Sequence, residues 1–186
     1  MAARTGGRSD TRLIVTMIVS TLVLLAVIIG GTLVLDGARG PSIDDRNLGP
    51  RIPTSVVYTD DGAATTYSLT GDWETWDGAT TAGAVEGWQG TYSSGSDSVA
   101  YGAARFTSQE DVDAFTEQLT SELEAAGATV RSEGETNTDG TGTLRILDTA
   151  DPNAPVQYLW DNGRGLVFTL AGEDWPVYEM YVAHEL

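Results

Sequence analysis

The sequence predicts an α+β fold, in which one N-terminal transmembrane helix precedes a single domain with an antiparallel sheet and one main packed helix. Three observations predict this class. An uncharged run fills positions 13–35. From residue 54 onward, short β-branched and aromatic segments alternate with turn signals. One amphipathic helical pattern interrupts those segments, and no alternation of strand and helix continues along the chain.

The uncharged run is long enough to cross a bilayer. A helix of this length spans roughly 35 Å, against a hydrocarbon core of about 30 Å. A cleaved signal peptide has a shorter apolar stretch and a small-residue cleavage site, and the residues after Leu35 do not supply such a site. We therefore expect a cytoplasmic tail at 1–12, a cell-membrane helix at 13–35 in contact with the lipid bilayer, and everything after it outside.

Residues 36–53 contain three prolines and three glycines without hydrophobic periodicity, which predicts a linker. The segment 54–186 holds 23 acidic residues and 4 arginines, so its net charge is −19. This acidic extracytoplasmic domain repels nucleic acid, which excludes that class of partner. Adaptation to concentrated salt is an alternative reason for the same composition. The chain has no cysteine, which excludes disulfides and thiol chemistry.

The first half of the domain predicts four strands. Residues 55–59 and 64–69 flank an Asp-Gly turn and form a hairpin. Two more strands are expected near 88–93 and at 99–106. The glycine-rich stretch 71–90 between the pairs is expected to be mostly irregular.

A helix is predicted over residues 108–126. Thr107 and Glu110 stand in the spacing of a capping box, and Gly127 is placed to end the helix. Acidic residues fill its first turns, where the helix dipole favours negative charge. One face repeats apolar residues at helical spacing, as expected for a helix that packs on a sheet: Val112, Phe115, Leu119, Leu123 and Ala126.

The second half predicts four further strands and a closing helix. The strands are expected at 128–132, 143–148, 156–160 and 165–170, the last two joined by an Asn-Gly turn. The tail 175–186 fits either a last strand or a short helix. Pro176 near the start of a helix favours the second interpretation, with Val177, Met180, Tyr181 and His184 on one face.

The order of these elements, the segment 67–73 (YSLTGDW) and the closing segment 165–172 (GLVFTLAG) before a terminal helix resemble the PsbP/Mog1-like extracytoplasmic domains of bacterial envelope proteins. The resemblance covers about residues 55–186. It implies an α/β/α sandwich with an accessory or binding role, and it supplies no catalytic residues.

Candidate chemistry is sparse. His184 is the only histidine and lies two residues from the end of the chain, so no catalytic residue is assigned. Asp72, Glu74 and Asp77 lie close together, but their spacing does not fit an EF-hand loop; they remain candidate ligands of a looser metal site. Three tryptophans could stack on a ligand or fill the core: Trp73, Trp76 and Trp88.

These observations predict a non-catalytic binding or accessory module, held in the membrane by one helix, with a protein partner and without a cofactor. The alternative is a carboxylate-dependent hydrolase that acts on an envelope polysaccharide. A hydrolase would need two carboxylates in one cleft beside the tryptophans.

Overall fold

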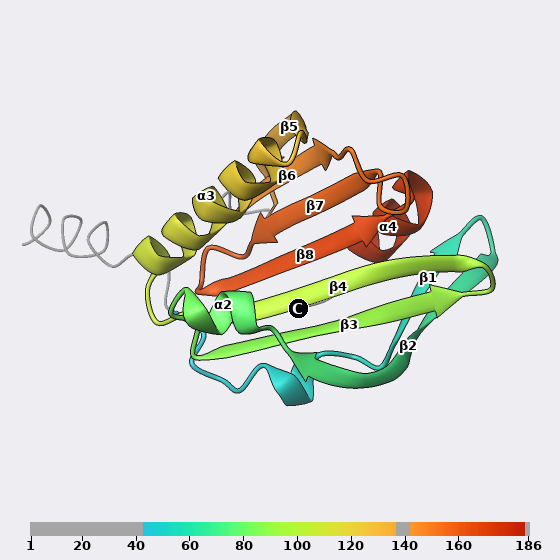
Figure 1. Cartoon of the computed structure of the whole chain (residues 1–186). Coiled ribbons are helices and arrows are strands. Elements are labelled where there is room, and N and C mark those ends of the chain that lie inside the picture. The colour runs from blue at the N-terminus through green and yellow to red at the C-terminus, as the bar shows by residue number, and fades with distance from the viewer. Residues whose placement is uncertain (1–42, 137–141, 185–186) are drawn as a thin grey trace, which may run out of the picture. The chain divides into compact units, whose positions relative to one another are not determined.

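Figure 1 shows the computed structural model of the protein, which describes residues 43–136 and 142–184. Eight strands form one antiparallel sheet in the order β1-β2-β3-β4-β8-β7-β6-β5. The strands are β1 (Ser55–Asp60), β2 (Ala63–Thr75), β3 (Glu86–Ser94), β4 (Asp97–Arg105), β5 (Thr129–Glu135), β6 (Thr143–Asp148), β7 (Val156–Asp161) and β8 (Leu166–Gly172). The helices are α2 (Asp77–Thr81), α3 (Gln109–Ala125) and α4 (Asp174–Val182), and a 3-10 turn covers Gly49–Arg51. The predicted α+β class with an antiparallel sheet is confirmed.

The predicted tail 1–12 and transmembrane helix 13–35 lie outside the described residues. Among residues 43–136 and 142–184, no helix is both long and apolar enough to span a bilayer.

The sheet consists of two four-stranded meanders that meet at its centre. The first runs from β1 to β4, and α3 then carries the chain to the far edge, where β5 begins. The second meander returns strand by strand until β8 pairs with β4, with Ala103 opposite Phe168. Apart from the short helix α2, which was not predicted between β2 and β3, the order of four strands, helix, four strands and helix matches the predicted order of elements.

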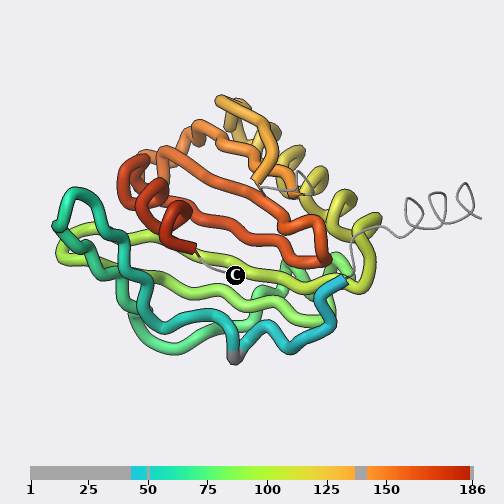
Figure 2. The backbone as a smooth tube through the Cα atoms, turned by 180° about the vertical axis from the view of Figure 1, so that it is seen from behind, coloured from blue at the N-terminus to red at the C-terminus, as the bar shows by residue number. Residues whose placement is uncertain are grey.

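Helices lie on both faces of the sheet, and each face has its own hydrophobic core. On one face, α4 covers the central strands with Val177 and Met180, which are buried against Tyr101, Phe168 and other apolar side chains. On the other face, Val112 and Phe115 of α3 pack on Phe106, Leu147 and Val167. Figures 1 and 2 show these two faces from opposite sides.

The segment 71–90 is more ordered than its composition predicts. Strand β2 continues to Thr75 through an irregularity between Thr70 and Glu74, where Gly71 has a φ of +84°. The short helix α2 follows, and β3 begins at Glu86. The glycine breaks the two-residue alternation that identifies a strand, so the sequence pattern hides the second half of β2.

The segment 43–53, predicted as the second half of the linker, is packed against the domain. The side chains of Leu48 and Ile52 are 0% and 5% exposed and belong to the core on the α4 face. Ile43 lies against Gly165, where an added Cβ would be 3.0 Å from its methyl group. The compact unit therefore begins at Ile43, eleven residues before the predicted boundary at residue 54.

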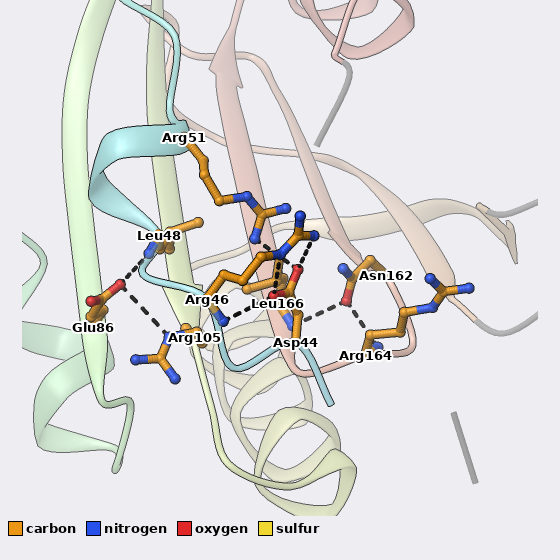
Figure 3. A network of polar contacts seen from close by, with 9 residues as sticks. All are labelled: Asp44, Arg46, Leu48, Arg51, Glu86, Arg105, Asn162, Arg164 and Leu166. Carbon is orange, nitrogen blue, oxygen red and sulfur yellow. Dashed lines mark hydrogen bonds and ion pairs between the residues drawn. The ribbon is translucent and has the colours of Figure 1, made fainter. Parts of the chain in front are cut away.

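Polar contacts hold the start of this segment in place (Figure 3). The Asp44 N–H donates to the carbonyl of Arg164 at 2.7 Å. The Asp44 carboxylate accepts hydrogen bonds from Arg46 at 2.8 Å and from Arg51 at 2.7 Å. The hydrogen bonds from Arg46, with a further contribution from Arg51, hold the pKa of Asp44 well below its usual range.

A second group of contacts fixes the segment farther along, also in Figure 3. The Leu48 N–H donates to the carboxylate of Glu86 on β3, and the same carboxylate oxygen lies 3.7 Å from Nε of Arg105 on β4. The segment is thus bonded to the open end of the β3–β4 hairpin through Glu86, whose carboxylate also lies beside Arg105 on the paired strand.

Candidate functional site

A groove of about 360 Å³ lies on the face of the sheet that carries α2 and α3. Helix α3 covers the β5–β7 side and α2 covers one end of β3 and β4, which leaves the adjoining part of β3, β4 and β8 without a helix over it (Figure 1). The groove is lined by side chains of β2, β3, β4, β7 and β8. Its volume lies within the range of about 300–1,000 Å³ that small-molecule sites occupy.

Trp76 closes one end of the groove. Its six-membered ring lies over Gly102 of β4, because a Cβ at Gly102 would be 3.1 Å from that ring. The ring also makes a T-shaped contact with Phe115 of α3, with centroids 5.4 Å apart. A side chain at position 102 would displace the indole, so this glycine allows the tryptophan to lie directly on the sheet.

Asp72 and Glu74 form the acidic wall of the groove. Asp72 lies within the irregularity in β2 and Glu74 at its end, and both line the cavity. Asp77, the first residue of α2, is exposed and does not line it. In the part of the chain that the structure describes, no group of three or more acidic or histidine side chains is arranged to hold a metal ion.

The floor of the groove carries polar side chains that the sequence analysis did not identify. Thr169 of β8 is only 9% exposed, and its hydroxyl makes no hydrogen bond with any described residue. Gln89 of β3 and Gln157 of β7 line the same cavity and are likewise unbonded within the described ranges. The only signal was a polar residue within each of two otherwise mainly apolar inner strands, Gln157 in β7 and Thr169 in β8. A polar side chain in such a strand indicates a face that is not fully covered.

The three candidate tryptophans do not form a common surface. Trp73 and Trp88 belong to the core on the α4 face, opposite the groove. The Trp73 ring contacts Tyr92 and Tyr101, with centroids 5.8 and 5.6 Å away. Trp88 packs against Gly49, and its buried Nε1 has no hydrogen-bond partner among the described residues. Of the three, only Trp76 lines the groove. Successive side chains of a strand point to opposite faces, and those of Trp73 and Trp88 point to the α4 face.

His184 is built into the core on the α4 face. Its ring packs against Trp160 and Phe168, and its Nε2 is hydrogen bonded to the Tyr101 hydroxyl at 2.8 Å. Burial lowers the pKa of His184 to about 4. The histidine is therefore a packed structural residue on the face opposite the groove.

An exposed apolar stripe runs along the outer side of α4. Trp175, Tyr178 and Val182 are 58%, 40% and 51% exposed, and their spacing of three and four residues places them on one side of the helix. The Trp175 ring contacts Tyr58 of β1, with centroids 6.5 Å apart. Large apolar side chains that gather on one exposed surface are typical of protein contact sites.

In comparisons with protein-family models, with curated proteins and with solved structures, nothing matched this chain. The resemblance to PsbP/Mog1-like domains stays a prediction, and the function has to be argued from the groove and its surroundings.

Proposed function

We propose that the protein is a single-pass envelope protein whose acidic extracytoplasmic domain is a non-catalytic binding module, and that the groove is its binding site. The observation that carries the proposal is the set of unbonded polar side chains in the groove beside Trp76. Gln89 is exposed, Gln157 is half-buried and the Thr169 hydroxyl borders the cavity, so their polar groups are open to a ligand that supplies hydrogen-bond partners. The anchor is the uncharged run 13–35.

The test is photo-cross-linking in cells that produce the protein, with and without a substitution that blocks the groove. A photoreactive amino acid at position 89 would cross-link the ligand bound in the groove, and the same group at Glu117, an exposed site on α3, serves as the control. We expect an adduct from position 89 only, and we expect Ala100→Arg, an exposed groove position, to abolish it. Ala64→Arg is the matched substitution on an exposed strand position outside the groove. An adduct that persists in the Ala100→Arg protein would refute the groove as the binding site.

The alternative function is a carboxylate-dependent hydrolase, and one observation favours it. Asp72 and Glu74 line one groove beside Trp76, so two carboxylates and an aromatic ring are brought together. The two proposals differ in a turnover assay of the full chain on envelope polysaccharides. A binding module releases no product, whereas turnover that Asp72→Asn or Glu74→Gln abolishes would establish the hydrolase.

We place the predicted protein partner on the α4 stripe, which is formed by Trp175, Tyr178 and Val182. The stripe supplies exposed aromatic area, which is enriched in protein interfaces. Co-purification from detergent-solubilised membranes tests this assignment. Trp175→Ala should release the partner, and Val85→Ala, at an exposed valine away from the stripe, should retain it.

A further inference from the structure

The groove combines three kinds of side chain. Carboxylates line one wall, amides and hydroxyls form the floor, and an indole closes one end. None of the lining residues, all of which belong to the described part of the chain, is basic. The set therefore offers acceptors at Asp72 and Glu74, and groups that both donate and accept at Gln89, Gln157 and Thr169.

We propose that the ligand of this groove is a neutral carbohydrate, bound as a short segment of an oligosaccharide chain. This inference rests on the proposed function of the groove as the binding site. Sugar hydroxyls both donate and accept, so they can use the carboxylates, the amides and the threonine hydroxyl together. The C–H groups of a pyranose ring supply apolar contact for the Trp76 ring.

Thr169 gives the argument its second, independent support. Its side chain is nine-tenths buried, and its hydroxyl has no partner among the described residues. The hydroxyl oxygen lies close above the backbone of Gly102, 2.7 Å from the place where a Cβ would be, and therefore borders the floor of the groove. This hydroxyl oxygen is not fully enclosed by protein atoms, so it faces the groove and can bond to water or to a ligand there.

Other ligand classes fit the groove less well. The absence of a basic lining residue disfavours phosphate, sulfate and carboxylate groups. A cationic peptide would pair with Asp72 and Glu74 and lie against the indole, but its ammonium groups accept no hydrogen bond. The amides of Gln89 and Gln157 would then depend on its backbone carbonyls, whereas every hydroxyl of a sugar can serve them. The open polar floor lacks the apolar lining that a hydrophobic small molecule requires.

The experiment measures calorimetric binding to the full chain in detergent micelles. The probes are four neutral linear hexasaccharides (an α-glucan, a β-glucan, a mannan and a chitin fragment) and hexalysine as the cationic probe. We expect at least one hexasaccharide to bind with a Kd below about 1 mM. Its affinity should not change between low and high salt, because the ligand carries no charge.

Variants connect this binding to the groove. Trp76→Ala should weaken the hexasaccharide about tenfold or more, since one aromatic contact and the end wall are lost. Thr169→Val should weaken it about 3- to 10-fold, the effect of one hydrogen bond, and Thr169→Ser should restore most of the affinity. Ala100→Arg, at an exposed floor position, should abolish binding without a change in the core. Ala64→Arg, at an exposed strand position outside the groove, is the matched control and should leave the affinity unchanged.

The possible failures are distinct. Hexalysine that binds with strong salt dependence and is lost in Ala100→Arg, while no hexasaccharide binds, would overturn the carbohydrate and leave the groove as the binding site. A hexasaccharide that binds equally well to Ala100→Arg would overturn the groove as its site. If neither class of probe binds, the carbohydrate inference and the groove both fail.

Discussion

At the scale of single residues, Tyr67 and Glu179 form a buried polar pair in the core on the α4 face. The Tyr67 hydroxyl donates to Oε2 of Glu179 on α4 at 2.6 Å, and the two residues are 0% and 6% exposed. Burial, with the hydrogen bond to Glu179, raises the pKa of Tyr67 well above its usual value, so the hydroxyl stays protonated and can donate. The pair joins β2 to the final helix across 112 positions of sequence.

Removing only the donor of this pair should be costly. Tyr67→Phe leaves the buried Glu179 oxygen without its partner, and we expect the free energy of unfolding to fall by about 1–3 kcal/mol. Glu179→Gln keeps an acceptor oxygen and should cost less. Urea denaturation of both variants measures the difference. A Tyr67→Phe protein as stable as the wild type would show that the hydrogen bond contributes nothing.

His184 predicts a dependence of stability on pH. Burial lowers its folded-state pKa to about 4, and the unfolded chain has the ordinary value of about 6.5. Between these values the unfolded state binds the proton and the folded state does not, so stability falls as the pH decreases from 6.5 to 4 and this contribution changes no further below pH 4. His184→Gln should have a flatter profile than the wild type over that window. Parallel profiles would contradict the buried, neutral histidine.

At the scale of elements, the sequence pattern predicted helix α3 but placed its N-cap one residue too early. The buried face of the helix was predicted only in part: Val112 and Phe115 are buried, whereas Ala126 is exposed. Thr116 and Thr120, which were not predicted, are buried as well, and the N-cap is Ser108 and not Thr107. The Ser108 hydroxyl oxygen accepts from the Asp111 N–H at 3.1 Å and also donates to the Asp111 carboxylate. Both hydroxyl residues precede a carboxylate by three positions, so the spacing alone allowed either cap.

A pair of matched substitutions tests the assignment of this cap. Ser108→Ala should lower the free energy of unfolding by about 1 kcal/mol, because an orphan N–H of the first turn loses its acceptor. Thr107→Ala, at the exposed neighbouring position, should change it by less than about 0.5 kcal/mol. Thermal melts of the two variants give the comparison. Equal losses, or a larger loss at Thr107, would show that the cap is misassigned.

The segment 43–53 is packed against the domain, although its composition predicted a linker. Its prolines and glycines are typical of a linker, but Leu48 and Ile52 enter the core and Asp44 is bound by two arginines. Asp44→Ala should release the segment, so that trypsin cleaves after Arg46 and Arg51 roughly tenfold faster, equivalent to about 1.4 kcal/mol of lost protection. Asp45→Ala, beside it and without a hydrogen bond within the described ranges, is the control. Equal cleavage of both variants would refute the role of Asp44.

At the scale of the whole molecule, the sequence resolved the class and the order of elements better than the site. Strands and helices follow from local hydrophobic periodicity. Tyr67 fits the two-residue period of a strand, and Phe115 and Val177 lie on the buried faces of helices. The groove depends on which strands become neighbours: Gln157 and Thr169 meet Gln89 only because β8 pairs with β4 at the centre of the sheet. No local pattern encodes that pairing, and the distant contact of Trp76 with Gly102 is hidden for the same reason.

The last prediction concerns the net charge of −17 on the chain. Carboxylates that outnumber arginines repel one another more strongly in the compact state than in the expanded one, so screening should stabilise the fold. The Debye length falls from about 30 Å at 0.01 M salt to about 10 Å at 0.1 M and to about 8 Å at 0.15 M. We therefore expect the melting temperature to rise by several degrees with sodium chloride, mostly below about 0.2 M, whereas sucrose at equal osmolality has little effect over that range. A rise confined to molar salt would indicate strengthened apolar burial instead, because that effect grows with salt concentration after screening is complete.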